Sequence, residues 1–365
     1  MRYSVFGNTG YNISKLCFGC MRFSEKATEE DHVALLNRAV EAGVNYFDTS
    51  PRYCNGNSER ILGKAFKKKR EDVFIATKYD VKTSSGDDLE RAVYRSLSEI
   101  DTDYIDFYQF WGINLDKFEN LIAVKNGPLE RALRLKEQGV IRHISFSAHE
   151  RSGRLSKIIE KGNGVFSSML CQYNFLNRSL LPDMVFAKSQ GLGVAIMSPL
   201  VGGRLNQPLP SQDTEQKSGL QIEPALRFVF NNPYIDVVLS GMSTTDMLLQ
   251  NVAIASNEQD MTKQEEKYIN QVTQEFAYLK EIYCTGCNYC LPCPNQVNIS
   301  HLMLMLQFYE VYGLKEVAKN RYRLLARTDK KDASACTQCG LCEERCPQTL
   351  SICKQLKKIH RIFTE

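Results

Sequence analysis

Eight cysteines in the last quarter of the chain fall into two runs with the spacing of metal ligands. The first run, CTGCNYCLPCP, spans residues 284–294, and the second, CTQCGLCEERCP, spans residues 336–347. Cysteines recur every three residues, except that the last step of the second run is four, and each run ends in Cys-Pro. Thiolates repeated at such short steps are typical ligands of iron–sulfur clusters. The pattern therefore predicts an iron–sulfur protein.

Zinc sites and disulfides are the alternative uses of these cysteines. Zinc sites usually have two Cys pairs a dozen or more residues apart, not three close steps. Disulfides are typical of secreted proteins, and the opening MRYSVFGNTGYNIS has no apolar signal-peptide core. Iron–sulfur chemistry is favoured over both.

The two runs resemble those of a bacterial ferredoxin, in which three thiolates of one run and the last thiolate of the other hold one 4Fe–4S cluster. The resemblance implies two clusters. The first would be held by Cys284, Cys287, Cys290 and Cys346. The second would be held by Cys336, Cys339, Cys342 and Cys293. In the first run, two residues precede the last Cys, where the common pattern has three. A single cluster is therefore the alternative.

Composition and charge exclude several classes of protein. A chain of 365 residues, 43% of them hydrophobic, has enough material for a large domain and a small one. A net charge of +4 is too small to indicate nucleic-acid binding, and no apolar run is long enough to predict a membrane span. We expect a cytoplasmic protein with a small-molecule substrate and neither nucleic acid nor membrane as partner.

Five of the thirteen cysteines lie outside the two runs. Cys17, Cys171 and Cys353 are expected to be small buried apolar residues. Cys20 and Cys54 lie beside the catalytic motifs described below and are candidates to line a pocket.

Before the cysteine runs, short apolar runs alternate with amphipathic helical patterns. A hairpin-like start is followed by expected strands at 15–19, 46–48, 73–78, 105–110, 143–147, 169–173, 194–197 and 236–239. A helical pattern follows each of them, and Ser58 is the expected N-cap of the helix 58–67. Eight such units and the right-handed crossover rule favour a closed (β/α)8 TIM barrel.

A doubly wound open sheet is the alternative fold, but no Gly-x-Gly-x-x-Gly turn follows the first strand. We expect the barrel domain to span residues 1–280. A small, mostly helical 4Fe–4S ferredoxin-type domain is expected over residues 281–365.

Active sites of such barrels lie at the carboxyl ends of the strands. The motifs there are FDTSPRY (47–53), ATK (76–78), QYN (172–174) and SPL (198–200). With these motifs, residues 1 to about 280 resemble the aldo/keto reductase family, and the whole chain resembles its iron–sulfur branch. The resemblance implies that Tyr53 is the general acid, with Lys78 and Asp48 as its supports. A Lys cation lowers the pKa of a Tyr from its ordinary value of about 10. The alternative is an ion pair that only stabilises the barrel core.

The family has a His at the end of the fourth strand, and this chain has Trp111, its single Trp. Indole offers one N–H donor, no acceptor and no titration near neutral pH. Substrate orientation must therefore differ, which favours a planar or bulky substrate, or reduction of an activated C=C bond. The alternatives are that Trp111 only packs the pocket wall, or that His149 replaces the missing imidazole.

Nucleotide-binding residues carry over from the resemblance as well. Ser147 and Gln172 match positions that bond the nicotinamide carboxamide, and Met197 matches a ring that stacks on it. The pyrophosphate loop would include Ser198, Leu200 and Gly202. The adenosine segment would include Gly241, Ser243, Gln250 and Asn251, before and along a helix N-terminus. Gly241 and Met247 replace the cations that clamp a 2′-phosphate, which favours NADH over NADPH.

The chain is thus interpreted as an NAD(P)H-dependent oxidoreductase with two 4Fe–4S clusters for electron transfer. Nicotinamide moves two electrons as hydride, whereas a cluster moves one, and a flavin normally mediates between them. Three interpretations follow: the clusters are structural, they exchange single electrons with the substrate or a partner ferredoxin, or the barrel holds a flavin. The alternative function is an electron-transfer module whose barrel is mainly a binding platform.

Overall fold

The computed structural model describes residues 1–21, 23–24, 26–150, 152–200, 221–275, 281–282, 284, 286, 288, 290–310, 315–328, 331–346 and 348–364. The chain forms two compact units. One contains residues 1–199 and 226–262, and the other contains residues 200–225 and 263–365.

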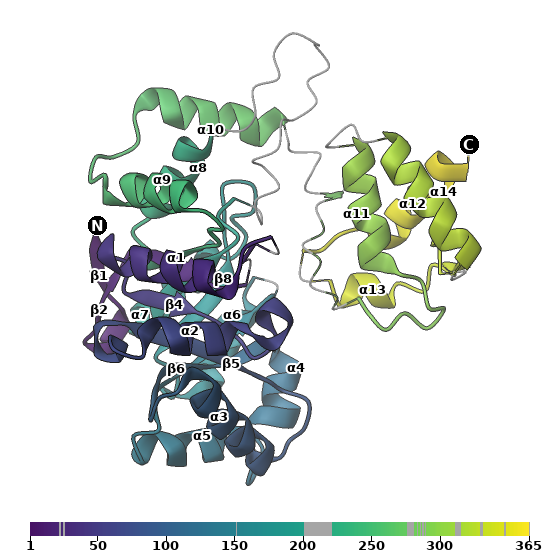
Figure 1. The fold of residues 1–365 in the computed structure, drawn as a ribbon. Helices are drawn as coiled ribbons and strands as arrows, with labels where there is room; N and C mark the ends of the chain where they lie inside the picture. The colour runs from purple at the N-terminus through teal and green to yellow at the C-terminus, as the bar shows by residue number, and fades with distance from the viewer. Residues whose placement is uncertain are drawn as a thin grey trace. The chain divides into compact units, whose positions relative to one another are not determined.

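Eight parallel strands of the first unit form a closed barrel in the order β10-β3-β4-β5-β6-β7-β8-β9 (Figure 1). They are β3 (Leu16–Gly19), β4 (Tyr46–Asp48), β5 (Phe74–Asp80), β6 (Ile105–Ile113), β7 (Ile141–Ala148), β8 (Ser168–Gln172), β9 (Gly193–Met197) and β10 (Val237–Ser240). Because β10 pairs with both β3 and β9, the sheet has no free edge. The predicted (β/α)8 barrel is confirmed, and the open doubly wound sheet is wrong.

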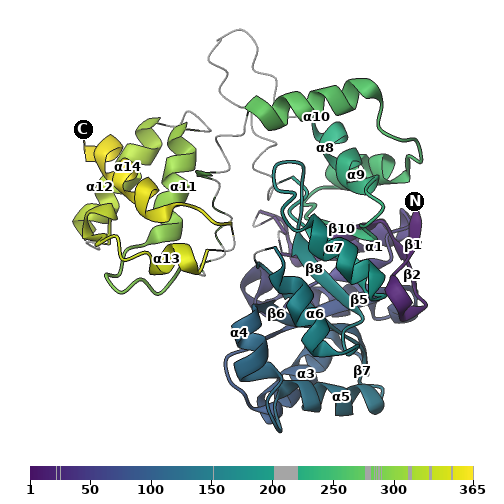
Figure 2. The same ribbon diagram turned by 180° about the vertical axis from the view of Figure 1, so that it is seen from behind.

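Helices follow the strands on the outside of the barrel, as Figures 1 and 2 show from opposite sides. They are α1 (Glu29–Glu41), α2 (Ser58–Phe66), α3 (Gly86–Ile100), α4 (Leu115–Lys117), α5 (Pro128–Glu137), α6 (Arg154–Gly162), α7 (Leu181–Ser189) and α9 (Thr245–Ser256). Helix α8 spans Ile222–Phe230. Within the described part of the chain, none of the helices combines the length and the apolar character needed to cross a membrane.

A hairpin of β1 (Tyr3–Val5) and β2 (Asn12–Ser14) closes the amino end of the barrel. Phe6, in the connection between these strands, is completely buried. Its ring lies 5.8 Å from that of Tyr46 and 5.3 Å from that of Phe107, measured between centroids. A Cβ on Gly193 would approach the Phe6 ring to 2.4 Å, so only glycine fits there. A ligand must therefore enter at the other end, where the strands finish.

Ser58 is not the N-cap that the sequence predicts but the first residue of α2. Its Oγ shares a hydrogen bond of 2.7 Å with Thr49 Oγ1. The same hydroxyl donates to the Cys20 carbonyl at 3.0 Å. Since Cys20 follows β3 and Thr49 follows β4, the Ser58 hydroxyl ties α2 to the carboxyl ends of two strands.

The second unit is mostly helical, as predicted. Its helices are α10 (Lys263–Glu275), α11 (Ile299–Glu310), α12 (Lys315–Thr328), α13 (Leu341–Glu344) and α14 (Ile352–Thr364). α11, α12 and α14 lie side by side (Figure 1) and share a core that includes Leu302, Leu306, Tyr322, Leu356 and Ile359. Helices α13 and α14 were not predicted, because α13 has only four residues and α14 directly follows the second cysteine run.

Candidate functional site

A buried ion pair joins β4 and β5 inside the barrel. Lys78 Nζ donates to Asp48 Oδ1 at 2.5 Å and to the Thr49 carbonyl at 2.6 Å. Lys78 and Asp48 are 1% and 2% exposed, so each charge requires the other. Gln109, on β6, donates to the second Asp48 oxygen at 3.0 Å. Burial lowers the pKa of Lys78, but Asp48 and Tyr53 raise it by more, and the lysine stays a cation.

Tyr53 lies beside this ion pair, in the loop between β4 and α2. Lys78 Nζ lies 4.7 Å from the centroid of the tyrosine ring. Burial is the largest influence on the pKa of Tyr53, and Lys78 acts in the expected direction, which is to lower it. Burial raises the pKa of the phenol, and Lys78 opposes that rise without cancelling it. The phenol therefore stays protonated at neutral pH, as a proton donor must be.

Trp111 lies near the carboxyl end of β6, edge to face with Tyr53. The ring centroids are 5.8 Å apart and the planes meet at 88°. The guanidinium carbon of Arg52 lies 5.8 Å from the Trp111 ring centroid, and Arg52 Nη2 pairs with Asp80 Oδ2 at 2.5 Å. The indole thus lies beside Tyr53, the residue expected to donate the proton. Asp48, Tyr53, Lys78 and Trp111, the four predicted catalytic residues, lie together.

Three neighbouring strands carry the residues expected to bind the nicotinamide. Ser147 lies in β7, and Gln172 and Met197 end β8 and β9 in register with each other. Ser147 Oγ accepts from the Gly112 N–H at 3.1 Å. The Gln172 side chain is hydrogen-bonded to His149, and burial lowers the pKa of His149 to about 4. His149 is therefore neutral, and its bond to Gln172 agrees with the interpretation of an ordinary hydrogen-bonded histidine.

The expected pyrophosphate loop begins at a strained residue. Ser198, directly after β9, has φ 58°, which is unfavourable for a non-glycine residue and recurs at ligand sites. Asn174 Nδ2 donates to the Ser198 carbonyl at 3.1 Å and holds this conformation. Leu200 belongs to the second unit, and Gly202 lies outside the described residues.

The expected adenosine segment links β10 to α9. Gly241 and Ser243 lie directly before the N-terminus of α9, where backbone N–H groups favour an anion. Gln250 is exposed on α9. Asn251 is buried, and its Nδ2 donates to Ser240 Oγ at 3.0 Å. Asn251 thus fastens α9 to β10.

An open hollow adjoins Tyr53 over the loops that follow β3 and β4. Its lining includes Met21, Phe23, His32, Arg52, Cys54 and Arg60. Of the two cysteines expected beside a pocket, Cys54 lines this hollow, whereas Cys20 is completely buried. Cys54 and Asn55 have φ 53° and 56°. Two consecutive left-handed residues make the sharp turn that follows Tyr53.

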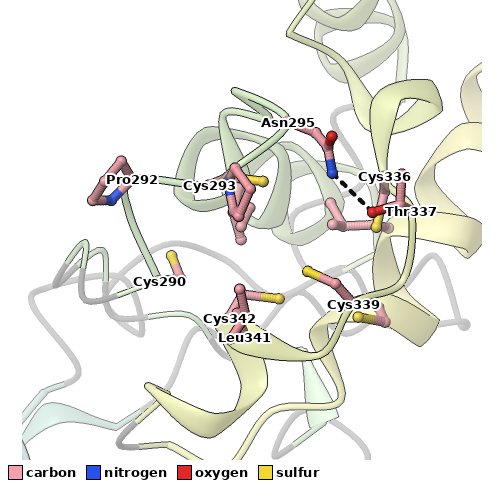
Figure 3. A pocket seen from close by; sticks show the side chains of 13 residues that line it. Cys290, Pro292, Cys293, Asn295, Cys336, Thr337, Cys339, Leu341 and Cys342 are labelled. Carbon is pink, nitrogen blue, oxygen red and sulfur yellow. Dashed lines mark hydrogen bonds between the residues drawn. The ribbon is translucent and has the colours of Figure 1, made fainter.

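A second hollow, in the other unit, is surrounded by thiols (Figure 3). Its lining includes Cys293, Cys336, Cys339 and Cys342, the four cysteines assigned to the second cluster. Among the described residues, no three His, Cys, Asp or Glu side chains are grouped to hold a single metal ion. The thiols surround a space instead (Figure 3), which suits a cluster of several iron atoms, because each thiolate binds a different iron.

The cysteines assigned to the first cluster are described only in part. Cys290 and Cys346 are buried, and the Cys284 sulfur accepts from the Gly286 N–H at 3.4 Å. Cys287 lies outside the described residues. Cys290 also lines the hollow of the second run.

The two cysteine runs have the same backbone turns at matching positions. Two residues after the first cysteine of each run, Gly286 and Gln338 have φ 72° and 56°. Four residues after it, Asn288 and Gly340 have φ 64° and 79°. Left-handed residues are uncommon outside glycine, so this agreement reflects a shared local structure.

The match continues beyond the last cysteine of each run. Three residues after it, Gln296 and Thr349 have φ 58° and 52°. Their N–H groups bond to the carbonyl of that cysteine at 2.9 and 3.1 Å. Six residues after it, α11 and α14 begin at Ile299 and Ile352. The one-residue difference between the runs is therefore confined to the step before the last cysteine.

Comparison with protein families decides the assignment. The profile of the Aldo/keto reductase family matches residues 15–221, more than half of the chain. The chain belongs to the aldo/keto reductase family. The profile of a 4Fe-4S dicluster domain matches residues 282–350. The protein is thus an aldo/keto reductase-type, NAD(P)-dependent oxidoreductase with a 4Fe–4S domain.

Individual relatives agree with an oxidoreductase. YqkF of Bacillus subtilis, described as an uncharacterized oxidoreductase, is 25% identical over 313 residues, 76% of this chain and 98% of YqkF. L-galactose dehydrogenase of Arabidopsis thaliana is 28% identical over 281 residues, 68% of this chain and 86% of the plant enzyme. The holo structure of aldo-keto reductase AKR11C1 from Bacillus halodurans has a TM-score of 0.63 at 26% identity, covering 74% of this chain and 96% of that one.

Two residues around the aldo/keto reductase site were not predicted. Gln109 was detectable as a polar residue inside the apolar strand sequence IDFYQFW. Arg52 directly precedes Tyr53, but its contact with Trp111 depends on side-chain direction, which spacing alone does not reveal.

Tyr53→Phe tests the proton donor. We expect a loss of turnover of about 100-fold or more, because only the phenolic proton is removed. Nicotinamide nucleotide binding should be nearly unchanged. Steady-state rates and calorimetric titration with the nucleotide measure the two effects.

Tyr94→Phe is the matched control, because Tyr94 is exposed on helix α3 and is not part of a site motif. Full activity in both variants would show that the reaction does not use Tyr53.

Proposed function

We propose that this aldo/keto reductase uses NAD(P)H to reduce a carbonyl or an activated C=C bond of a small, planar or bulky substrate, with two 4Fe–4S clusters for electron transfer. The observation that carries the substrate class is the edge-to-face contact of Trp111 with Tyr53. A flat indole stands there in place of an imidazole that would orient a simple carbonyl.

The residues of the barrel have separable roles in this reduction. A bound nicotinamide would supply the hydride. Tyr53 donates its phenolic proton to the substrate atom on which negative charge develops. The Lys78 cation stabilises the phenolate that remains, and Asp48 holds Lys78 in place. Since Lys78 and Asp48 are shielded from water, their electrostatic effect is stronger than that of an exposed pair.

Trp111 selects the substrate by its shape. An aromatic or conjugated ligand gains on the order of 1 kcal/mol from contact with an indole. Arg52 and Asp80 hold the indole in place before any ligand arrives, so little conformational freedom is lost on binding. A small aldehyde makes less of this contact.

Two clusters, rather than one, are supported by the matching turns of the two cysteine runs. A backbone that is the same at three pairs of positions is expected to hold the same kind of group twice. A cluster exchanges one electron at a time, so a one-electron partner such as a ferredoxin, or a flavin, would connect it to hydride chemistry.

Replacement of Trp111 by His tests the substrate class. Wild-type protein should prefer a cyclic enone to a small aldehyde. Trp111→His should move the ratio of kcat/KM toward the aldehyde by roughly fivefold, the equivalent of about 1 kcal/mol. The measurement is kcat/KM of both forms on both substrates.

Trp111→Phe is the control, because it keeps a flat wall and should keep the enone preference. A wild-type preference for the aldehyde that neither variant alters would reduce Trp111 to a packing residue. Turnover of neither substrate, with reduced clusters passing electrons to a ferredoxin, would favour an electron-transfer module.

Metal analysis tests the number of clusters. Anaerobically purified protein should contain about eight iron atoms and about eight acid-labile sulfides per chain, four of each for every cluster. About four iron atoms would contradict two clusters, and stoichiometric zinc would contradict iron–sulfur chemistry in the cysteine runs.

Nucleotide titration tests the cofactor preference. NADH should bind at least as tightly as NADPH, because Gly241 and Met247 offer no cation to a 2′-phosphate. Gly241→Lys should improve NADPH binding and leave NADH binding nearly unchanged. A tenfold preference of wild type for NADPH, about 1.4 kcal/mol, would mean that another cation binds the phosphate; Arg204, outside the described residues, is the candidate.

A further inference from the structure

Cys353 is a ninth cysteine of the iron–sulfur domain, and it lies at the hollow of the second run. It is the second residue of α14 and lines the same hollow as Cys336, Cys339 and Cys342. It is only partly buried, so the expectation of an ordinary buried apolar residue is wrong. Six thiols therefore line this hollow, because Cys293, the fourth assigned ligand, and Cys290, assigned to the first cluster, line it as well. Only four are needed for the second cluster.

Cys353 is tied to the segment that carries one particular ligand. It lines the same hollow as the thiol of Cys342. The Cys353 N–H donates to Glu343 Oε1 at 2.7 Å, and Glu343 directly follows Cys342. Both Cys342 and Glu343 lie in the short helix α13. Cys353 and Cys342 thus belong to one rigid piece of structure.

The first run has no thiol at the position that matches Cys353. Because α11 and α14 begin at matching positions, Ile299 and Ile352, the counterpart of Cys353 is Ser300. By the same alignment, the counterpart of Cys342 is Cys290. The two sites therefore differ at a position next to an assigned ligand, where one has a thiol and the other a hydroxyl.

We propose that Cys353 is a reserve ligand of the second cluster, able to bind the iron that Cys342 would otherwise hold. This inference rests on the proposed presence of two clusters. In the exchange, an iron–sulfur bond forms to Cys353 in place of the bond to Cys342. The Cys353 thiol loses its proton as it binds, the released Cys342 thiolate takes up a proton, and no electron is transferred. A thiolate is a suitable ligand, whereas the neutral Ser300 hydroxyl is a poor one for iron in such clusters.

Iron content of full-length variants tests the reserve ligand. Wild type and Cys353→Ser should each hold about eight iron atoms per chain, and Cys342→Ser should also stay near eight. The double variant Cys342→Ser/Cys353→Ser should fall to about four, because both thiols next to that iron are removed. Iron and acid-labile sulfide are measured after anaerobic reconstitution, and electron paramagnetic resonance of the reduced protein should show an altered second signal in Cys342→Ser.

The first site supplies the matched experiment. Cys290→Ser has a serine, Ser300, at the position that matches Cys353, and it should fall to about four iron atoms. Cys290→Ser/Ser300→Cys places a thiol at the matching position and should restore a value near eight. This gain keeps the test informative if the loss variants fold poorly, and far-ultraviolet circular dichroism checks the helices of every variant.

The outcomes separate this inference from the proposed function. A wild-type content of about four iron atoms would contradict the two clusters themselves. Suppose that wild type holds about eight iron atoms, and that Cys342→Ser holds about four whether or not Cys353 is present. That result would overturn the proposal of a reserve ligand but not that of two clusters. The same iron content in Cys342→Ser and in the double variant would also overturn the reserve ligand.

Discussion

The ammonium group of Lys78 has almost no water around it, and the interior of the barrel is arranged to satisfy it. An unpaired buried charge costs several kcal/mol, so Asp48 must lie beside it, and the Thr49 carbonyl must face it. Gln109 occupies the remaining Asp48 oxygen. One series of polar contacts thus joins β4, β5 and β6 through an apolar core. Tyr53 lies next to the ammonium group, in the position that these contacts leave open.

This arrangement makes Tyr53, the proposed proton donor, a different acid from the one that a neighbouring charge alone predicts. A neighbouring cation acts to lower the pKa of a phenol, but removal from water acts in the opposite direction and is the larger effect for Tyr53. The Lys78 cation therefore affects the protonated phenol less than it would stabilise the phenolate formed by proton transfer. Trp111, by covering one side of Tyr53, contributes to the same exclusion of water.

The barrel was predictable because its strands are short apolar runs between amphipathic helices, a pattern with few topological solutions. That Asp48 and Lys78 meet also followed from their places at the ends of neighbouring strands. The direction of the Tyr53 pKa was not predictable, because burial depends on side chains from several strands at once. The place of Cys353 was not predictable either, since it emerges only when the turns of both runs are superimposed and α14 is known to start where α11 does.

The position of Cys293 links the second hollow to the order in which the chain is made. This residue belongs to the first run, yet it lines a hollow with thiols of the second. A ribosome releases Cys293 well before Cys336, Cys339 and Cys342, so the hollow does not exist while the chain is still growing. A translation product that stops between the two runs would carry a finished barrel and an incomplete metal site. On the proposed ligand assignment, iron at this hollow would be retained only by chains in which both runs have been made.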